Sequence, residues 1–370
     1  MTLDPQVVPH ATALDAVVAG AVRVRLVDAT PGDQAAVIAQ LGPLRPADAA
    51  PADITIRYVD RLPVPAGMRF IGPHELGVGE DGTLIVLRGR HRRPVRVRIP
   101  VADLGGPCEL VCEHGVGRVP HLVAAINLAL LRHDIVALHA SAVEVDGRAV
   151  VATGWSKGGK TEVVLALLAR GARLVGDEWL HLRPDGTVTG IREPVRVWDW
   201  QLDQLDAVRG AVGRRSRARL AAVRVAHRAV SSRSPRLATV LDRQRGVDVD
   251  GARLSSQRPA SGPVPIGPVL LVTSADRGDI VVVPTTGHEV AERMVASLAY
   301  ERAPLRELAD AHRFAHPGTA LPLLDGAADR ERTLLHARLD DRPSVEVVHP
   351  YPVDLAHLGA VVADVAEGCR

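Results

Sequence analysis

The segment from Gly154 to Thr161 reads Gly-Trp-Ser-Lys-Gly-Gly-Lys-Thr and fits the pattern G-x-x-x-x-G-K-[S/T] at every fixed position. Glycines in such a segment let the backbone curl so that its N–H groups point inward at phosphate oxygens. The lysine of this pattern reaches the β and γ phosphates of a nucleotide, and the hydroxyl after it is a ligand for Mg²⁺. The segment therefore predicts a phosphate-binding P-loop, with Lys160 on the phosphates and Thr161 on the metal.

The residues on either side of the loop have the secondary structure that a P-loop needs. Two apolar, β-rich runs, 136–145 and 148–153, are separated by Asp146-Gly147 and predict a hairpin whose second strand enters Gly154. After the loop, Glu162-Val-Val-Leu-Ala-Leu-Leu-Ala-Arg170 consists of good helix formers and precedes a glycine, where helices commonly end. A helix that starts at the loop adds the positive end of its dipole to the phosphate site.

The expected ligands are ATP, with GTP as the alternative, and Mg²⁺. Of the 45 basic side chains only two are lysines, Lys157 and Lys160, and both lie in this loop. Trp155 allows two interpretations, since its ring can shield phosphate or stack on a base, or it can pack against the adjoining hairpin. The residues assigned to the nucleotide are Gly154, Trp155, Ser156, Lys157, Gly158, Gly159, Lys160, Thr161 and Glu162.

Two carboxylates, Asp177 and Glu178, end the next short apolar run, sixteen residues after Thr161. In a parallel sheet the next strand places its carboxyl end beside the phosphate loop. Phosphoryl transfer needs an acid that helps to hold Mg²⁺ and often a base that takes the proton of an acceptor hydroxyl. The alternative is that both carboxylates only solvate the end of a strand.

The segment from Leu138 to Trp179 resembles the catalytic core of HPr kinase/phosphorylase, the HPr serine kinase C-terminal domain. In that family a hairpin with a conspicuous histidine precedes the P-loop, and a strand of the type Arg-Leu-Val-Ala after the next helix ends in two acids. The corresponding segments here are Leu138-His139-Ala140-Ser141-Ala142-Val143, Gly159-Lys160-Thr161-Glu162 and Arg173-Leu174-Val175-Gly176-Asp177-Glu178. The chain departs from the family in having Lys157 where the loop usually has glycine, and glutamate as the second acid.

The resemblance implies a kinase that transfers the γ-phosphate of ATP to a Ser or Thr hydroxyl of a protein or peptide. It implies that Asp177 accepts the proton and that His139 lies beside the phosphates. Together with Lys160, these two residues form the expected catalytic set. It places Glu178 near the metal, with Thr161. From the residues alone, His139 is equally a structural histidine at the apolar end of a strand. The family also forms oligomers, which makes a homo-oligomer compatible with the resemblance.

The pattern along the chain predicts an α/β protein with a P-loop, HPr kinase-like core behind a β-rich N-terminal domain. Residues 1–134 contain alternating strand patterns at 21–27, 54–58, 83–88 and 95–99, followed by a connecting helix at 120–132. Residues 135–345 form the expected P-loop domain, with further strands at 268–273 and 279–284 and helices near 287–302 and 304–313. Residues 346–370 supply the rest of a C-terminal strand and a helix expected to pack on this core.

An arginine-rich insertion interrupts the expected core at about 209–245, where eleven arginines face a single acid, Asp242. Such a run can bind nucleic acid or an acidic protein surface. It has no interleaved aromatic residues for base stacking, which argues against nucleic acid. The remaining alternatives are a solvated helical hairpin or loop, and a docking surface for an acidic acceptor.

Composition and the remaining motifs narrow the class of protein. The chain has 370 residues with 46% hydrophobic residues, and no apolar stretch long enough for a membrane span. Its N-terminus lacks the features of a secretory signal, and three cysteines, Cys108, Cys112 and Cys369, are no disulfide framework, so the cytoplasm is the expected location. The cysteine spacing is not a usual zinc pattern, and Trp198-Asp-Trp200 is expected in the core. Besides a kinase, the motifs fit an NTPase that drives a partner, or a nucleotide-sensing binding protein.

Overall fold

The computed structural model describes residues 13–71, 76–80, 82–90, 93–191, 193–231, 234–255 and 257–368. Cys369 and the first twelve residues, including the N-terminus considered above, lie outside these ranges. About 39% of the chain is helix and 28% is strand, which confirms a mixed α/β protein. Within the described residues, no helix combines the length and the apolar character that crossing a bilayer requires.

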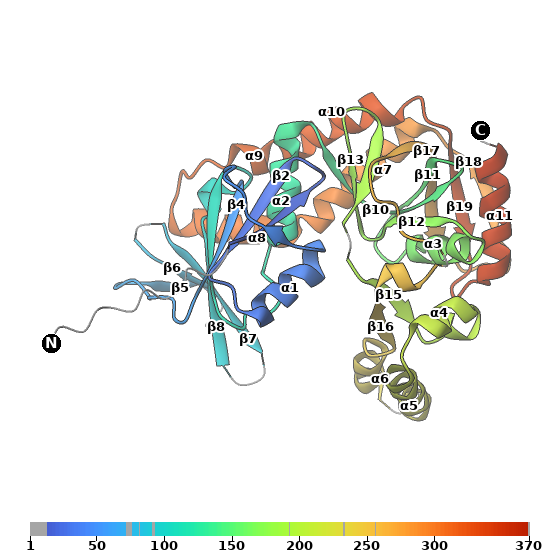
Figure 1. The fold of residues 1–370 in the computed structure, drawn as a ribbon, viewed down its shortest axis with the longest axis horizontal. Coiled ribbons are helices and arrows are strands. Elements are labelled where there is room, and N and C mark those ends of the chain that lie inside the picture. The colour runs from blue at the N-terminus through green and yellow to red at the C-terminus, as the bar shows by residue number, and fades with distance from the viewer. Residues whose placement is uncertain are drawn as a thin grey trace. The chain divides into compact units, whose positions relative to one another are not determined.

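The chain folds into two compact units (Figure 1). Unit 1 contains Met1–His133 and Arg302–Ala327, and unit 2 contains Asp134–Glu301 and Ala328–Arg370. The helical residues 302–327 therefore belong with the N-terminal sheet, although the expected P-loop domain included them. His312 and His316 explain this placement, because their ring nitrogens lie 3.3 Å from the Gly82 carbonyl oxygen and 3.1 Å from that of Gly79.

Unit 1 is built on a sheet of nine described strands in the order β3-β1-β2-β4-β9-β8-β7-β6-β5. β2 and β9 pair parallel with β4, and the other neighbours pair antiparallel. The elements of unit 1 are β1 (Leu14–Val18), β2 (Val22–Val27), α1 (Pro31–Leu41), β3 (Arg45–Pro46), β4 (Ile54–Val59), β5 (Arg69–Ile71), β6 (Leu76–Val78), β7 (Leu84–Arg90), β8 (Arg93–Ile99), η1 (Val101–Asp103), β9 (Cys108–Glu113), α2 (Leu122–Leu130), η2 (Leu131–His133), α8 (Ala303–Ala315) and α9 (Pro322–Asp325).

The period-two patterns that predicted strands are confirmed at β2, β4, β7 and β8. In β2 the apolar residues are buried and the arginines alternate with them, as expected. The arginine side is not simply solvated, however. Arg23 and Arg25 are half-buried, and both bind the fully buried carboxylate of Asp15, at 2.6 and 2.9 Å.

Unit 2 contains a ring of strands at its centre, in which β10 pairs with β11 and β13, β13 with β14, and β17 with both β14 and β11. β12 also pairs with β10, and β19 and β18 continue the sheet beyond β17. The elements of unit 2 are β10 (Val136–Val145), β11 (Arg148–Thr153), α3 (Lys160–Ala169), β12 (Arg173–Gly176), β13 (Trp179–Leu182), β14 (Thr187–Gly190), β15 (Val195–Trp198), η3 (Gln201–Asp203), α4 (Asp206–Ala211), α5 (Arg214–Val230), α6 (Pro235–Asp242), β16 (Gly246–Val249), η4 (Gly251–Arg253), β17 (Val264–Ser274), β18 (Val281–Pro284), α7 (Gly287–Glu301), α10 (Ala327–Leu339), β19 (Ser344–His349) and α11 (Leu355–Gly368).

The core of unit 2 lies where α3 and the C-terminal helix α11 pack together against the strands. Val163 and Leu167 of α3 and Leu358 and Val362 of α11 are almost completely buried there. Gly359 permits the close approach of the two helices, since a Cβ atom at this residue would lie 3.1 Å from the carbonyl oxygen of Ala166. The packing holds the helix that begins at the glycine-rich loop.

The arginine-rich stretch forms the helices α5 and α6, which pack on each other (Figure 1). They connect β15 and β16, which form a two-stranded sheet of their own. In α5 only Leu220 is buried, so most of the helix faces solvent.

Candidate functional site

The loop from Gly154 to Gly159 joins β11 to α3 and has glycine where no other residue fits. Gly154 has φ +144°, and a Cβ atom there would lie 2.4 Å from the carbonyl oxygen of Val272 in β17. Gly159 has φ +109°, and its Cβ would lie 2.0 Å from Nε2 of His349, the last residue of β19. Both positions need the left-handed region and close contact with a neighbouring strand, which explains two fixed glycines of the motif.

Lys160 is buried at the start of α3 and faces the loop itself. Its Nζ donates hydrogen bonds to the carbonyl oxygens of Trp155, at 3.0 Å, and Gly154, at 3.5 Å. Burial lowers the pKa of this amine, although Glu178, Asp177 and other carboxylates act against that shift. Lys157, in contrast, is exposed and has φ +64°. The two lysines of the chain therefore occupy different environments.

Asp177 lies at a break between β12 and β13 and is 2% exposed. Its carboxylate accepts a short hydrogen bond from the Ser141 hydroxyl, and the Thr161 hydroxyl lies 3.2 Å from both carboxylate oxygens. Burial, and after it the charge of Glu178, raise the pKa of Asp177 to about 6. A buried carboxylate that titrates near neutrality is suited to accepting a proton.

The route by which Asp177 reaches the loop differs from the sequence argument. The sequence predicts the two acids at the end of a strand next to β11 in a parallel sheet. In the structure β10 lies between β11 and β12 and is antiparallel to both. β10 is ten residues long and pairs with β12 and then with β13, which leaves Asp177 and Glu178 at the interruption, beside Ser141.

Glu178 and His139 form a second polar pair beside Asp177. Glu178 has φ +69°, and its Oε2 lies 3.2 Å from Nε2 of His139. The histidine is 4% exposed, and its Nδ1 lies 3.1 Å from Oε1 of Glu301 in α7. Burial disfavours the imidazolium, but the contacts with Glu178 and Glu301 outweigh it, so the pKa of His139 is raised. A protonated His139 thus brings positive charge to the same side of the loop as Lys160.

The loop, His139 and Glu178 line one side of a pocket of about 740 Å³, a size in the range that holds ligands the size of a nucleotide, and Asp177 is buried behind Thr161. Ser156, Lys157 and the segment 159–162, with His139 and Glu178, face a second wall formed by the small β15–β16 sheet and nearby segments. That wall contains Arg196, Trp198, Asp199, Trp200, Asp242, Arg245 and Tyr351. Trp198 and Trp200 are half-buried and line this pocket. Trp200 also packs against the core of unit 2, so the expectation that both rings lie in the core holds only in part.

The second wall is ordered by its own ion pairs. Arg245 binds both carboxylate oxygens of the buried Asp199, each at 3.1 Å, and also Asp242. Arg196 lies over the ring of Trp198, at 5.7 Å from its centre, and binds Asp248. Paired guanidinium groups and half-exposed aromatic rings give this wall polar and stacking surfaces that face the loop.

The Trp155 side chain is 51% exposed and packs on Tyr300 of α7, with 4.8 Å between the ring centres. The ring of Trp155 thus has an aromatic neighbour in α7, which the sequence did not indicate. Glu162, also assigned to the nucleotide, is buried and accepts a hydrogen bond of 3.0 Å from Gln201. Burial raises the pKa of Glu162.

Three residues around the loop were not assigned a role from the sequence. Ser141 binds Asp177, Glu301 contacts His139, and His349 donates from Nε2 to the Gly158 carbonyl oxygen at 3.1 Å. Ser141 stood inside the quoted motif, but nothing in the spacing distinguished it. Glu301 and His349 come from α7 and β19, more than a hundred residues after the loop, and no local pattern marks them.

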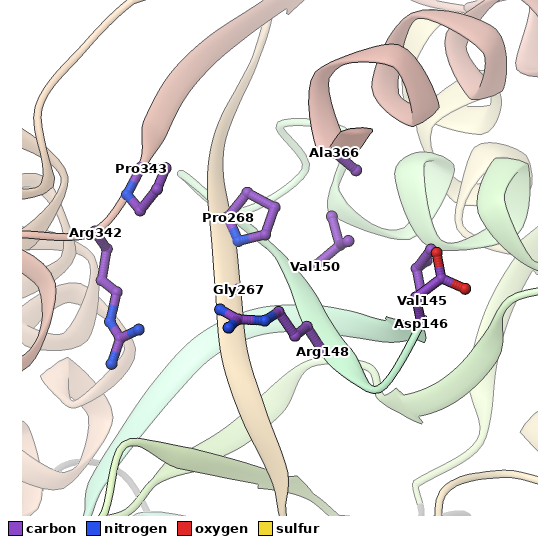
Figure 2. A pocket seen from close by; sticks show the side chains of 9 residues that line it. All are labelled: Val145, Asp146, Arg148, Val150, Gly267, Pro268, Arg342, Pro343 and Ala366. Carbon is purple, nitrogen blue, oxygen red and sulfur yellow. The ribbon is translucent and has the colours of Figure 1, made fainter. Parts of the chain in front are cut away.

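A second pocket of about 390 Å³ lies at the other end of the β10–β11 hairpin (Figure 2). Asp146 and Arg148 at the turn, Pro268 of β17 and Arg342 border it. β11 runs from Arg148 at this pocket to Thr153 at the loop, a distance of about 17 Å for the five residue steps of a strand. The two pockets are therefore separate.

The donor set at the loop is made of hard oxygen atoms. The Thr161 hydroxyl and the carboxylates of Asp177 and Glu178 are the ligand types that Mg²⁺ prefers. Cys108 and Cys112 lie in unit 1, where burial raises their pKa values to about 11 and about 12, so both are inert thiols.

No protein-family model matches this chain, and no curated protein matches it either.

Proposed function

We propose that this protein is a P-loop kinase of the HPr kinase type, which uses ATP and Mg²⁺ to phosphorylate a Ser or Thr hydroxyl of a protein or peptide. The main support is the environment of Asp177. Its buried carboxylate, with a pKa of about 6, is hydrogen-bonded to the hydroxyl of Thr161, the residue that ends the P-loop motif. A base at this position is needed for transfer to a hydroxyl, whereas simple nucleotide binding does not require one.

The loop and α3 bind the phosphates. Backbone N–H groups of the loop and of the first turn of α3 donate hydrogen bonds to the phosphate oxygens, and the positive end of the helix dipole adds to this attraction. The Lys160 amine lies at the mouth of the loop and turns from the carbonyl oxygens of Gly154 and Trp155 to the β and γ phosphates. His139, protonated between Glu178 and Glu301, adds a second positive charge near them.

Thr161 and Glu178 would hold Mg²⁺, with Asp177 beside them. The metal would supply positive charge against the β and γ phosphates. Ser141 and Thr161 both donate to Asp177, which fixes its carboxylate for the proton transfer. His139 orients Glu178 by the contact of 3.2 Å between Nε2 and Oε2.

The transfer step uses Asp177 as the base. The acceptor oxygen forms a bond to the γ-phosphorus, the bond from that phosphorus to the β–γ bridging oxygen breaks, and ADP leaves. The proton of the acceptor hydroxyl passes to a carboxylate oxygen of Asp177. The acceptor enters the pocket on the side of Trp198, Trp200 and Tyr351, which face the loop.

The acceptor is acidic in this proposal, and α5 and α6 provide its docking surface. Asp242 and Arg245, at the end of α6, line the pocket, so the hairpin leads directly to the site. Val225, Leu237 and Val240 are exposed apolar residues on the same hairpin, which favours a protein over nucleic acid. Seven of its arginines form no ion pair with any residue that the structure describes: Arg214, Arg215, Arg217, Arg219, Arg228, Arg236 and Arg243.

A cytoplasmic setting fits this activity, because ATP is abundant there and the thiols of Cys108 and Cys112 stay reduced. The test is to incubate the protein with γ-labelled ATP, Mg²⁺ and a degenerate peptide mixture with Ser or Thr at its centre and Asp or Glu around it. Label in the peptides supports the proposal. Label only in inorganic phosphate identifies an NTPase, and ATP binding without release of label identifies a nucleotide-sensing protein, and either result contradicts the kinase.

A further inference from the structure

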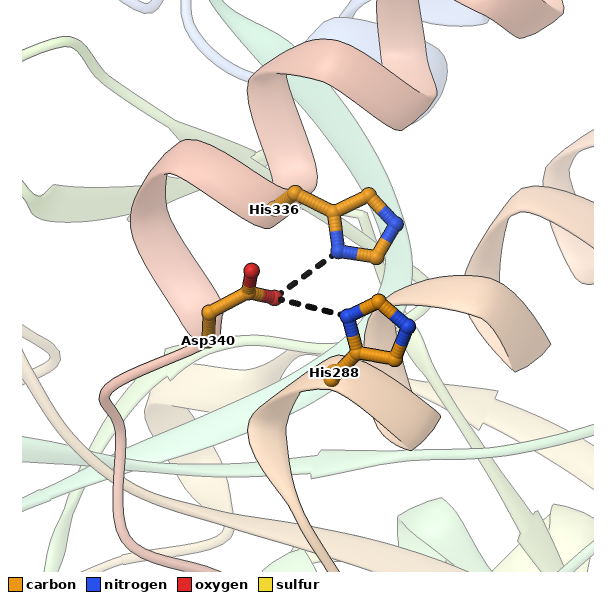
Figure 3. A group of neighbouring side chains, drawn as sticks. All are labelled: His288, His336 and Asp340. Carbon is orange, nitrogen blue, oxygen red and sulfur yellow. Dashed lines mark hydrogen bonds and ion pairs between the residues drawn. The ribbon is translucent and has the colours of Figure 1, made fainter.

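Two histidines and a carboxylate meet where the start of α7 approaches the end of α10, in unit 2 (Figure 3). His288 is in the first turn of α7, His336 is in the last turn of α10, and Asp340 follows that helix. Oδ1 of Asp340 lies 2.8 Å from Nδ1 of His336 and 3.6 Å from Nδ1 of His288. None of these residues lines the pocket at the P-loop motif.

The spacing of these atoms fits a tetrahedral metal ion. Ligands at about 2.1 Å from Zn²⁺ stand about 3.4 Å from one another in a tetrahedron. The two distances from Asp340 Oδ1 to the histidine nitrogens bracket this value, and the available ligand atoms of all three residues lie within 4.8 Å of one another. Imidazole nitrogen with one carboxylate oxygen is a donor set that Zn²⁺ accepts.

The backbone holds the two helix ends in this arrangement. Gly287 precedes His288 and Leu339 precedes Asp340, and these two neighbours are in direct contact. A Cβ atom at Gly287 would lie 1.7 Å from the carbonyl oxygen of Leu339, so only glycine allows the approach. The ligand-bearing residues therefore follow a fixed contact between two helices, which limits the entropy lost when an ion is bound.

A second carboxylate orients His336 from its other side. Oε1 of Glu292 lies 2.8 Å from Nε2 of His336, and Arg332 holds the same oxygen through its Nε at 3.1 Å. Histidines that bind metals commonly donate their free N–H to a carboxylate, which fixes the tautomer that leaves the other nitrogen for the metal. Glu292 thus supports Nδ1 of His336 as a ligand atom, beside Asp340.

We propose that His288, His336 and Asp340 bind Zn²⁺, with Glu292 as the carboxylate behind His336 and water in the fourth position. The ion links α7 to α10. At its other end α7 carries Tyr300 and Glu301, which contact Trp155 and His139 at the proposed phosphate site. The zinc site is therefore a structural clamp on the helix that borders that site, and it does not depend on the proposed kinase activity.

The test is calorimetric titration of the full chain, without a polyhistidine tag and after removal of metals by EDTA, with ZnCl₂ in the presence of excess Mg²⁺. One equivalent of Zn²⁺ is expected to bind the wild type. The His288→Ala and His336→Ala variants should lose at least a hundredfold in affinity, and Glu292→Gln about tenfold. His357→Ala, at an exposed histidine of α11, is the matched control and should bind as the wild type does.

Two further measurements separate the loss of zinc binding from a loss of folding. Co²⁺ in place of Zn²⁺ should give the intense visible absorption of a tetrahedral centre in the wild type and not in His336→Ala. His288 is 65% exposed, so His288→Ala should fold as the wild type does, which circular dichroism without metal can verify. Zinc binding that survives in both His288→Ala and His336→Ala, or no binding by the wild type, would overturn the proposal.

Discussion

Lys160 and Lys157 allow a comparison of two lysines within one loop. Lys160 is buried and directed at the loop carbonyls, and Lys157 is exposed at a variable position of the motif. Lys160→Ala removes the compact cation that faces the β and γ phosphates, so affinity for Mg²⁺–ATP should fall at least tenfold, ~1.4 kcal/mol. Lys157→Ala should have a much smaller effect in the same calorimetric titration. Equal losses in the two variants would show that the loop does not bind phosphate as proposed.

The pKa of Asp177 sets a pH dependence for the transfer step. The proposed base acts in its ionised form, which dominates above a pKa of about 6 and is lost below it. The single-turnover rate of transfer should therefore be level from pH 7 to 8 and fall about tenfold per pH unit well below 6. The measurement is a rapid-quench series at saturating ATP. The same pH profile in the wild type and in Asp177→Asn would exclude Asp177 as the base.

At the scale of residues, the sequence predicted those parts of the site that follow one another along the chain. The loop residues, Asp177 and Glu178 all lie between residues 154 and 178, and the structure brings them together with His139. Ser141, Glu301 and His349 were missed because their roles depend on pairing between distant elements. A single serine, glutamate or histidine carries no signal of its own in one sequence.

Among the elements, the α5–α6 hairpin makes the clearest prediction. If its unpaired arginines attract an acidic acceptor, replacing Arg214, Arg215 and Arg228 together by alanine should raise KM for an acidic Ser peptide at least fivefold and weaken its dependence on salt. ATP affinity should not change. The matched control replaces three exposed arginines elsewhere in unit 2, Arg148, Arg253 and Arg277. Identical KM values in both triple variants would show that the hairpin does not dock the acceptor and is only a solvent-exposed surface.

The packing of α11 on α3 predicts a large effect on stability. Leu358 is fully buried between the helices, so Leu358→Ala should lower the free energy of unfolding of unit 2 by about 2–5 kcal/mol. Leu237, on α6, is 55% exposed, and Leu237→Ala should change the free energy of unfolding of unit 2 by less than about 0.5 kcal/mol. Denaturant unfolding followed by tryptophan fluorescence reports on unit 2, since all four tryptophans lie there. Similar effects in the two variants would contradict the observed packing.

Elements with a clear local period were predicted well, and their pairing was not. The runs at 136–145 and 148–153 became β10 and β11, and the apolar residues after the loop became α3. The closure of the ring through β14 and β17, and the pairing of β15 with β16, join segments about fifty or more residues apart. Period and turn residues describe each strand alone, so they do not identify its distant partner.

For the whole molecule, the mixed α/β class followed from the alternation of strand and helix patterns. The division into units was harder to predict, because α8 and α9 return to the N-terminal sheet after α7. An amphipathic helix such as α8 shows which face it buries, but not which sheet it covers. The contacts of His312 with Gly82 and of His316 with Gly79, which support this placement, have no counterpart in the sequence pattern.

The kinase proposal depends on one charge, the carboxylate of Asp177. Asp177→Asn keeps the shape of the side chain and its place beside Ser141 and Thr161, but it cannot take a proton. General-base catalysis is typically worth about 10²–10⁴-fold. The decisive measurement is single-turnover transfer from γ-labelled ATP to an acidic Ser peptide, beside equilibrium binding of Mg²⁺–ATP, for the wild type and Asp177→Asn. The proposal predicts a rate at least about a hundredfold lower with ATP affinity unchanged within a few-fold. Transfer by Asp177→Asn at the wild-type rate would contradict it.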